Sequence, residues 1–516
     1  MEDNERQVIL NTLREFSTPD RPVYLVGGAV RDTLLNRPAH DFDFVLQGNT
    51  HKLAEQISCR LGGALYTLDE DRGTIRVILE AGPKWRERTL LDFASLRGAT
   101  LEGDLRARDF TINAMAMDVA APQRLIDPTG GLLDLREKRI RACTPTSLSQ
   151  DPVRVLRAVR QAVGFQFKIE PETLRLMRNA APLLPRISAE RLRDELFRML
   201  EGPKVSLAVR LLDQVGALGQ VLPELKALQG VTQTRPHIDD VWEHTLAVVD
   251  YLEELLPPLT GAYREDSVSD LTVGSAVLWL GRFRQQLSEH YQRRLSDERS
   301  LTGLLFLATL YHDAGKPETR TETAEGQVRF LDHPKTGGRM IALRARALAL
   351  SVAETSRLET IVEQHMRVHF LSDSQPNIAH PDGKPSRRAI YRFFKDTGPA
   401  GVDICLMSLA DLRGTYGVTL PQDIWERELR TIRALLEAYW EKHEEVVSPP
   451  RFFNGNDLMQ AFQLEPGQRL GHLLEAIREA QGAGEIRERE EVMAFARHWL
   501  QDHPEPGEIS GEKGEN

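Results

Sequence analysis

The segment from residue 23 to residue 46 restricts the fold of this chain more than any other. It contains a short apolar run, VYLV, then two glycines, Gly27 and Gly28, and then a helical stretch, AVRDTLLN, that ends before Pro38. Paired glycines let the backbone approach a ligand closely, and the amides at the start of a helix attract phosphate. This order of strand, glycine turn and helix favours a nucleoside triphosphate as ligand, although a glycine turn can also be purely structural.

The next strand, DFDFVL, carries two carboxylates, Asp41 and Asp43, two positions apart. Side chains alternate along a strand, so both carboxylates point to one face while Phe42 and Phe44 point into the core. Two like charges this close are unfavourable unless a cation lies between them, and carboxylate oxygens suit Mg²⁺. The pattern indicates a magnesium site rather than a solvated strand edge.

Two Mg²⁺ ions about 4 Å apart can activate an attacking hydroxyl and neutralise a leaving pyrophosphate, which is the chemistry of nucleotidyl transfer. A third carboxylate usually completes such a site from a neighbouring strand. Asp92 in TLLDFASL is the candidate, and a plain strand-end position is the alternative. The chain contains no GxxxxGK[ST] segment, which argues against a P-loop NTPase.

Length and composition indicate a folded chain of several domains. Its 516 residues correspond to about three to four domains, and 41% hydrophobic with 28% charged residues excludes a disordered polyelectrolyte. The apolar runs are shorter than the ~20 residues that cross a bilayer, so we expect no membrane contact. The polar N-terminus lacks a secretory pattern, and we expect a cytoplasmic protein. Three dispersed cysteines exclude a disulfide framework and a zinc ribbon.

Charge is spread unevenly along the chain. The net charge of −10 does not by itself suggest a nucleic-acid partner, but lysine and arginine outnumber the acidic residues between Arg141 and Gly230. In the same stretch the β-rich pattern of residues 22–140 gives way to helices with apolar residues at three- and four-residue spacing. We therefore expect a mixed α/β domain followed by helical domains. The basic stretch is either a solvated helical face or a nucleic-acid contact.

Several of these motifs resemble those of one known family. GGAVRDTLLNRPAHDFDFVL is similar to the head-domain motif of the tRNA nucleotidyltransferases and bacterial poly(A) polymerases, the class II branch of the polymerase-β-like nucleotidyltransferases. RARDFTINAMAMD resembles the second motif of that family, and IDPTGGLLDL resembles the motif that joins head and neck. SQDPVRVLRAVR resembles the neck motif, and ISAERLRDELFRML the helix that follows it. The similarity covers nearly all of residues 20–500.

The resemblance implies roles for individual residues. Arg108 and Asp109 would hold the incoming nucleotide, with Asp109 on the ribose 2′-hydroxyl. Asp151 and Arg154 would pair with the base edge of CTP or ATP in place of a nucleic-acid template, and Arg157 would lie next to the phosphates or the base. The other nucleotide contacts that the resemblance implies are Gly27, Gly28, Arg31 and Asn113.

Selection of the base by protein side chains is chemically reasonable. A carboxylate accepts from the exocyclic amino group that cytosine and adenine share, and a guanidinium donates to a ring nitrogen or carbonyl. Three positions depart from the family, because Gln150 stands in place of a common Glu, Ala107 in place of a common Arg and Gln161 in place of a common Phe. The first two touch nucleotide selection and phosphate contacts, so the nucleotide preference stays open.

The region 231–420 concentrates histidines, and the order of its candidate ligands resembles the H…HD…D pattern of the HD phosphohydrolase superfamily, with two further histidines. Imidazole and carboxylate clusters bind divalent transition metals, and a bound ion lowers the pKa of water toward 7. The expected ion is Ni²⁺, Mn²⁺ or Co²⁺, and the alternative to a hydrolase is a metal site that only stabilises helices. The candidate ligands are His244, His312, Asp313, His333, His365 and Asp411.

The resemblance implies a template-independent nucleotidyltransferase that adds C and A from CTP and ATP to the 3′ end of tRNA, contacting the acceptor arm. Its HD domain would process 3′-phosphate or cyclic-phosphate ends. The alternatives are a poly(A) polymerase, a CC-adding or A-adding enzyme or, from another class, an HD metal-dependent phosphohydrolase with an RNA-binding head. The sequence leaves the oligomeric state open. The expected domains are an α/β polymerase-β-like head at 1–140, a helical neck for nucleotide selection and RNA binding at 141–230, an HD domain at 231–420, a C-terminal helical tRNA-binding domain at 421–502 and a disordered acidic tail at 503–516.

Overall fold

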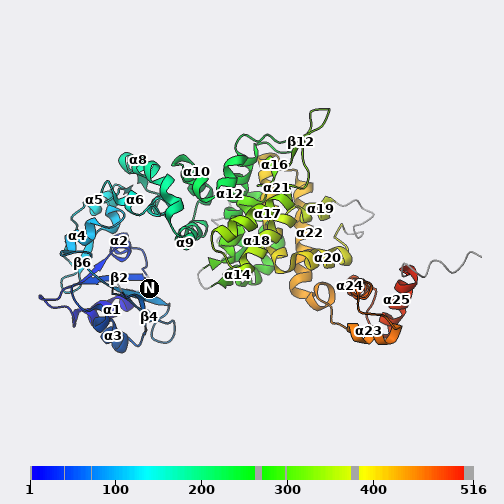
Figure 1. Ribbon diagram of the computed structural model, residues 1–516, viewed down its shortest axis with the longest axis horizontal. Helices are drawn as coiled ribbons and strands as arrows, with labels where there is room; N and C mark the ends of the chain where they lie inside the picture. Colours follow the sequence, from blue (N-terminus) through cyan, green and yellow to red (C-terminus); the bar gives the residue numbers. More distant parts are fainter. Residues whose placement is uncertain are drawn as a thin grey trace, which may run out of the picture. The chain divides into compact units, whose positions relative to one another are not determined.

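The chain divides into two compact units, Met1–Val221 (unit 1) and Leu222–Asn516 (unit 2), whose elements are labelled in the computed structural model of Figure 1. The expected acidic tail lies outside the described residues, apart from its first two positions. The structure describes residues 3–504 except residues 40, 71–72, 262–269, 297–298 and 374–382.

A mixed seven-stranded sheet forms the centre of unit 1. Its strand order is β3-β4-β5-β2-β1-β6-β7, in which β2 and β5 are parallel neighbours and every other pair is antiparallel. Helices α1 and α3 lie together on one side of this sheet (Figure 1). The elements of this α/β part are α1 (Asp3–Arg14), β1 (Val23–Val26), α2 (Gly28–Leu34), β2 (Asp41–Leu46), α3 (Thr50–Leu61), β3 (Ala64–Asp69), β4 (Thr74–Leu79), β5 (Thr89–Ser95), α4 (Leu101–Arg106), η1 (Thr111–Asn113), β6 (Ala116–Asp118), β7 (Leu125–Ile126) and α5 (Gly131–Arg136).

Strand β2 follows the alternation that its sequence predicts. Phe42 and Phe44 are buried, and the ring of Phe44 stacks on Phe93 of β5 at 5.3 Å between centroids. Asp41 and Asp43, which alternate with the two phenylalanines, are exposed. The strand therefore anchors one face in the core and presents two carboxylates on the other.

The rest of unit 1 is helical. Helix α7 carries an apolar stripe, including Val155, Leu156 and Val159, that is fully buried, and α7 packs against α9 and α10. These helices bring the predicted neck residues to the α/β part. The elements are β8 (Arg139–Ile140), α6 (Ser147–Gln150), α7 (Arg154–Phe165), β9 (Lys168–Ile169), α8 (Pro171–Ala180), η2 (Ala181–Arg186), α9 (Ala189–Leu200), α10 (Val205–Gln214) and α11 (Leu218–Val221).

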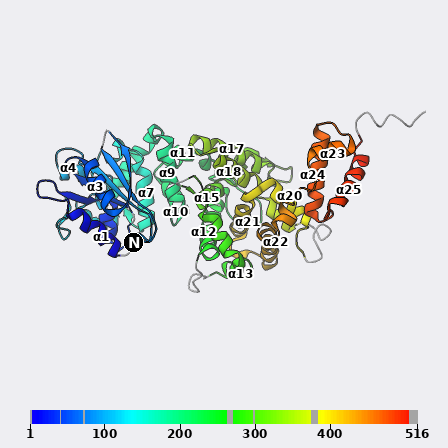
Figure 2. The same cartoon turned by 90° about the horizontal axis from the view of Figure 1, so that it is seen from below.

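Unit 2 is mainly helical, and Figure 2 shows its helices from below. Its most buried helix is α15, where every residue from Gly303 to Tyr311 is buried because α12, α14, α17, α18 and α21 surround it. A separate apolar cluster centred on Leu458, Leu473 and Val492 holds the last three helices together.

The bounds of the elements in unit 2 begin with η3 (Pro223–Leu228), α12 (Val241–Thr260), α13 (Leu271–Leu280), η5 (Gly281–Phe283), α14 (Arg284–Gln292), β10 (Arg294–Ser296), β11 (Arg299–Ser300), α15 (Leu301–Tyr311), α16 (Lys316–Thr319), β12 (Arg320–Glu322) and β13 (Val328–Phe330). They continue with α17 (His333–Ala347), α18 (Val352–Gln364), α19 (Arg367–Asp373), α20 (Arg387–Thr397), η6 (Gly398–Ala400), α21 (Gly401–Tyr416), η7 (Gly417–Thr419), α22 (Gln422–Glu441), η8 (His443–Val447), α23 (Gly455–Phe462), α24 (Gln468–Ala483) and α25 (Arg489–Asp502).

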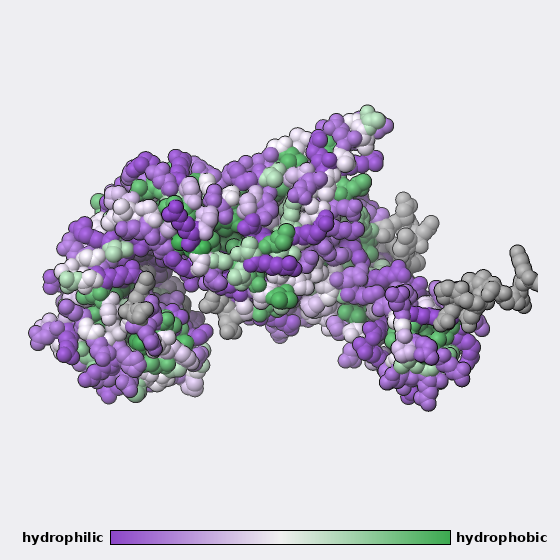
Figure 3. Space-filling view, viewed as in Figure 1, coloured by the Kyte–Doolittle hydropathy of each residue, from purple (hydrophilic) through white to green (hydrophobic). Residues whose placement is uncertain are grey.

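Within the described part of the chain, no helix is long and apolar enough to span a membrane. Hydrophilic residues cover most of the face seen in Figure 3, and the apolar residues on it form separate patches.

Candidate active site and candidate metal centre

The carboxylate of Asp43 lies next to the glycine turn. Asp43 pairs in register with Val26 of β1, the residue before Gly27. A Cβ atom at Gly27 would stand 3.1 Å from Asp43 Oδ2 and 3.0 Å from Arg108 Nη1, and the φ of 74° is strained for any residue with a side chain. Glycine at this position therefore lets the turn pass close to both charged groups.

The surroundings of Asp43 favour a bound cation. The residue is exposed on its strand, but protein atoms lie close around its carboxyl, and this burial is the main reason that its pKa is raised above the ordinary value. Arg108 opposes this shift, and the carboxylates of Asp92 and Asp41 add to it. Negative charge without full compensation, on oxygen ligands that face one way, fits a divalent cation such as Mg²⁺.

Asp92 lies beside Asp43 on the parallel strand β5, as expected for a third carboxylate. Its two oxygens accept from Arg76 of β4, with Nε–Oδ1 and Nη2–Oδ2 both at 2.8 Å. Sequence reasoning missed this ion pair. The run TIRVILE places Arg76 on the face opposite Ile75, but only the register between β4 and β5 shows that it meets Asp92.

A chain of hydrogen bonds connects α2 to the neck helix α7. Arg31 Nη1 donates to Asn113 Oδ1 over 2.6 Å, and Asn113 Nδ2 donates to Asp109 Oδ1 and to Gln161 Oε1, both over 3.0 Å. Arg157 Nε donates to Asp109 Oδ2, also over 3.0 Å. Gln161 is buried, and a phenylalanine in its place could not accept from Asn113. Gln161, which departs from the family pattern, therefore has its own hydrogen-bond partner in Asn113.

Arg157 also joins α7 to α9. Its Nη1 donates to Glu195 Oε1 over 2.8 Å, and Arg160 Nε donates to Glu195 Oε2 over 2.9 Å. Burial favours the neutral forms of Asp109 and Glu195, but the pKa of each carboxyl is lowered below its ordinary value, by Arg157 and Asn113 for Asp109 and by Arg160 and Arg157 for Glu195. Both carboxylates therefore stay ionised and hold the guanidinium groups in place.

A pocket of about 350 Å³ opens beside this network, lined by Arg108, Asp151 and Arg154 among others. Asp151 Oδ2 accepts from Arg191 Nη2 over 2.8 Å, whereas its buried Oδ1 has no hydrogen-bond partner among the described residues. Arg154 instead donates to the protein, from Nη1 to Ser147 Oγ over 2.7 Å and from Nη2 to a backbone carbonyl over 3.1 Å. Asp151 Oδ1 is therefore a buried acceptor at this pocket that has no partner among the described residues.

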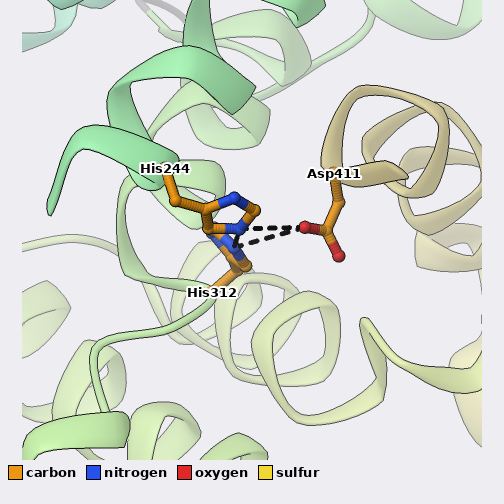
Figure 4. Close-up of side chains that lie close together, drawn as sticks. All are labelled: His244, His312 and Asp411. Atoms are coloured by element: carbon orange, nitrogen blue, oxygen red, sulfur yellow. Dashed lines mark hydrogen bonds and ion pairs between the residues drawn. The ribbon is translucent and has the colours of Figure 1, made fainter. Parts of the chain in front are cut away.

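The predicted histidine ligands of unit 2 also come together. His244 on α12, His312 directly after α15 and Asp411 on α21 turn toward one another (Figure 4). His244 Nε2 lies 3.1 Å from Asp411 Oδ1 and 3.3 Å from His312 Nε2. Three helices that are distant in sequence therefore meet at one buried cluster.

Asp313, His333 and His365 form a second group of possible ligands beside the first. Asp313 Oδ1 lies 3.4 Å from His333 Nε2 and 3.9 Å from His365 Nε2, while Asp313 Oδ2 lies 3.2 Å from His312 Nε2. All six predicted ligands are thus gathered in one place.

Backbone carbonyls fix the orientation of three of these rings. The Nδ1 atoms of His312, His333 and His365 each face the carbonyl three residues earlier, at 2.7, 2.8 and 2.7 Å. A carbonyl only accepts, so Nδ1 carries the proton and Nε2 presents its lone pair. The Nε2 atoms of His333 and His365 have no hydrogen-bond partner among the described residues. Burial, followed by the nearby His312 and His333, lowers the pKa of His365 to about 3, which keeps it in the neutral form that binds metals.

Three further residues of this centre, His369, Glu428 and Lys316, were not among the predicted ligands. His369 lies between Asp411 Oδ2 and Glu428 Oε1, with Nε2 and Nδ1 each at 3.0 Å from a carboxylate oxygen. Lys316 Nζ lies 2.6 Å from Asp313 Oδ2. His369 follows His365 by one helical turn, a spacing that could have signalled a shared centre, whereas nothing in the sequence marks the role of Glu428.

Comparison with known proteins defines the class of this chain. Residues 23–141 match the poly A polymerase head domain, and residues 166–229 match the domain described as the probable RNA and SrmB-binding site of polymerase A. The nucleotidyltransferase fold is the one expected from the sequence. The Thermotoga maritima CCA-adding enzyme complexed with tRNA matches with a TM-score of 0.55 at 21% identity, over 97% of this chain and 96% of that one.

Two relatives, similar over nearly the whole chain, identify the family within this class. The CC-adding tRNA nucleotidyltransferase of Geobacter sulfurreducens is 30% identical over 94% of this chain and 93% of its own length. The A-adding tRNA nucleotidyltransferase of Deinococcus radiodurans is 31% identical over 93% of this chain and 96% of its own length. The chain belongs to the tRNA nucleotidyltransferase family, which confirms the family resemblance of its head and neck motifs.

Proposed function

We propose that this protein adds C and A from CTP and ATP to the 3′ end of tRNA without a nucleic-acid template. The observation that carries this proposal is the position of Arg108, which lies between two features. On one side is the carboxylate pair of β2, and on the other is the pocket with Asp151, whose Oδ1 has no partner among the residues that the structure describes. A nucleotide bound along Arg108 would place its phosphates near the carboxylates and its base near Asp151.

Each residue then has a separate task. Asp41 and Asp43 would hold Mg²⁺, which when bound supplies activation of the 3′-hydroxyl and charge neutralisation of the leaving pyrophosphate. Arg108 offers a guanidinium to the phosphates, and the network around Asp109 and Asn113 fixes the floor on which the ribose would lie. Asp151 Oδ1 would accept from the exocyclic amino group of cytosine or adenine, whereas uracil presents a carbonyl there and is repelled.

The test supplies tRNA that ends before CCA and tRNA that ends in CC, with CTP or ATP given separately. Product lengths distinguish a CCA-adding enzyme from a CC-adding enzyme, an A-adding enzyme and a poly(A) polymerase. These alternatives stay open because the relatives include CC-adding and A-adding enzymes and the head matches a poly A polymerase domain. Asp41→Asn and Asp43→Asn variants should give no product, because the carboxylate pair is lost. Addition above a few per cent of wild type in both variants would contradict the proposed role of the pair and favour a head that only binds RNA.

We further propose that the histidine cluster makes residues 231–420 an HD-type metal-dependent phosphohydrolase that acts on 2′,3′-cyclic or 3′-phosphate ends. The Nε2 atoms of His333 and His365, which have no hydrogen-bond partner within the described ranges, support a divalent transition metal there, with Ni²⁺, Mn²⁺ and Co²⁺ as candidates. Hydrolysis of 2′,3′-cyclic AMP with each ion added tests this activity. No hydrolysis by a metal-loaded protein would leave a site that only stabilises the helices.

A further inference from the structure

We propose that Gln161 on α7 is a positioning residue for recognition of the ribose. Through Asn113 it holds the carboxylate of Asp109 in the orientation that accepts the 2′-hydroxyl of the incoming nucleotide, and so it strengthens the preference for ribonucleotides over deoxyribonucleotides. This inference rests on the nucleotide addition proposed above and deepens it. The observation behind it is that Gln161 is buried and accepts from Asn113 over 3.0 Å.

The carboxylate of Asp109 is held on both of its oxygens. Oδ1 accepts from the backbone N–H of Phe110 over 2.8 Å and from Asn113 Nδ2 over 3.0 Å, which occupies its two lone pairs. Oδ2 accepts one hydrogen bond within the described part of the chain, from Arg157 Nε over 3.0 Å. Asp109 also lines the pocket of about 350 Å³. The second lone pair of Oδ2 can therefore accept from a ribose hydroxyl that enters this pocket.

The side-chain amide of Asn113 is held at three points. Arg31 Nη1 lies 2.6 Å from one end of the amide, and a guanidinium only donates, so that end is Oδ1. The other end, Nδ2, then directs one N–H to Asp109 and the second to Gln161. Because Asn113 is buried, removal of the Gln161 oxygen leaves an N–H without its acceptor, which is unfavourable and allows the amide to turn away from Asp109.

One face of α7 thus controls both oxygens of Asp109. Gln161 follows Arg157 by four residues, which places the two side chains next to each other on the helix. Arg157 holds Oδ2 directly, and Gln161 holds Oδ1 through Asn113. A change at Gln161 should therefore affect the contact with the sugar and leave the phosphates and the base in place.

Arg31 contributes to the same support. Its Nε and Nη2 donate to the two carboxylate oxygens of Asp32 over 2.8 and 2.9 Å, and its Nη1 donates to Asn113. Its Cζ also lies 4.4 Å from the centre of the Phe165 ring at the end of α7. Every nitrogen of this guanidinium has a protein partner, so Arg31 joins α2 to Asn113 and to α7.

The experiment compares CTP with 2′-dCTP in the full chain. It measures kcat/KM for the first addition to tRNA that ends before CCA, and ATP with 2′-dATP on tRNA that ends in CC gives the second comparison. In Gln161→Leu, kcat/KM for the ribonucleotide should fall about fivefold or more, since a buried N–H loses its acceptor. The value for the deoxynucleotide should stay within about twofold of wild type, because it has no 2′-hydroxyl to donate. Gln161→Met keeps the length of the side chain without the amide and replaces Gln161→Leu if that variant does not fold.

A double variant tests whether Gln161 acts through Asn113. Asn113→Ala should itself weaken the preference for ribonucleotides, and adding Gln161→Leu to it should cause no further loss, because the two residues form one pathway. Gln481→Leu is the matched control, since Gln481 is a buried glutamine of unit 2 that donates to the carbonyl of Pro450 over 2.8 Å. It should keep the wild-type preference.

Two results would overturn the role of Gln161 and leave the proposed addition standing. One is an equal loss with ribonucleotide and deoxynucleotide in Gln161→Leu, which would mean that Gln161 only packs. The other is a further loss of preference in the double variant. No addition by the wild-type protein with either pair of nucleotides would overturn the proposed function, and this inference with it.

Discussion

Asp151 is the residue at which base selection can be tested most directly. Its Oδ2 is held by Arg191, and its buried Oδ1 has no partner in the described part of the chain, so the carboxylate is oriented and has an acceptor to offer. Replacing it with Asn should weaken discrimination against UTP by about 1–3 kcal/mol, since an amide can donate to the uracil carbonyl that a carboxylate repels. The ratio of kcat/KM for CTP and UTP measures this change.

The control for that measurement is Asp194→Asn, which alters another carboxylate of the same pocket, one that pairs with Arg193 at 2.9 Å. Selectivity should be kept. Unchanged selectivity in Asp151→Asn would place the selecting group elsewhere.

Functional residues could be predicted from the sequence where a local pattern marks them. They were missed where the packing of distant elements brings their partners to them. Asp41 and Asp43 follow from alternation along one strand, and the family pattern led to Asp151. Arg76 and Gln161 could not be assigned in this way, because their partners belong to elements whose register and packing the sequence does not state.

Helix α18 shows how a single element can make stability depend on pH. Ser351 caps the helix, and Glu354 closes the capping box and also pairs with Arg299 of β11 at 2.7 Å. Burial favours the neutral carboxyl, but the hydrogen bonds from Arg299 and Ser351 lower the pKa of Glu354 from 4.5 to about 2. The stabilisation is therefore complete above pH 4.5 and is lost as the pH falls toward 2.

Glu354→Gln should lower the free energy of unfolding at pH 7 by about 3 kcal/mol, from the size of that shift. The difference from wild type should shrink between pH 4.5 and 2. Urea unfolding at several pH values measures it, and Glu359→Gln on the same helix is the control that should behave like wild type. A difference that stayed constant with pH would contradict the assignment.

Element boundaries were predictable where the hydrophobic period is clear. The runs VYLV, DFDFVL, TIRVILE and TLLDFASL form β1, β2, β4 and β5, whereas β3 and β6 were not anticipated. In the stretch LLPPLTGAYREDSVSDLTVG, α12 continues through Pro257 and Pro258 to Thr260, and α13 begins at Leu271. Residues 262–269 of that stretch lie outside the described residues. Each proline lacks an N–H and so removes one helical hydrogen bond, and both lie near the end of α12.

The two proposed activities belong to different units of the chain. The carboxylate pair and the base pocket belong to unit 1, and the histidine cluster belongs to unit 2. Changing His312 and Asp313 together to Ala should remove bound transition metal and any hydrolysis of cyclic phosphate, because both groups of ligands lose a member. Nucleotide addition to tRNA with a free 3′-hydroxyl should persist within about twofold, since no imidazole of the cluster takes part in it. Addition and hydrolysis assays on one preparation measure both, and equal loss of the two activities would refute their independence.

The burial of nearly all of α15 has a consequence for biosynthesis. The ribosome releases this apolar helix before α17, α18 and α21, which cover much of it, and α21 ends about a hundred residues later. At a translation rate of about 5–20 residues per second, the helix waits roughly 5–20 s for its last neighbour. During that interval only α12 and α14, of its neighbouring helices, are available to cover LTGLLFLATLY, so it is a partly exposed apolar segment on the nascent chain and a candidate site for a chaperone.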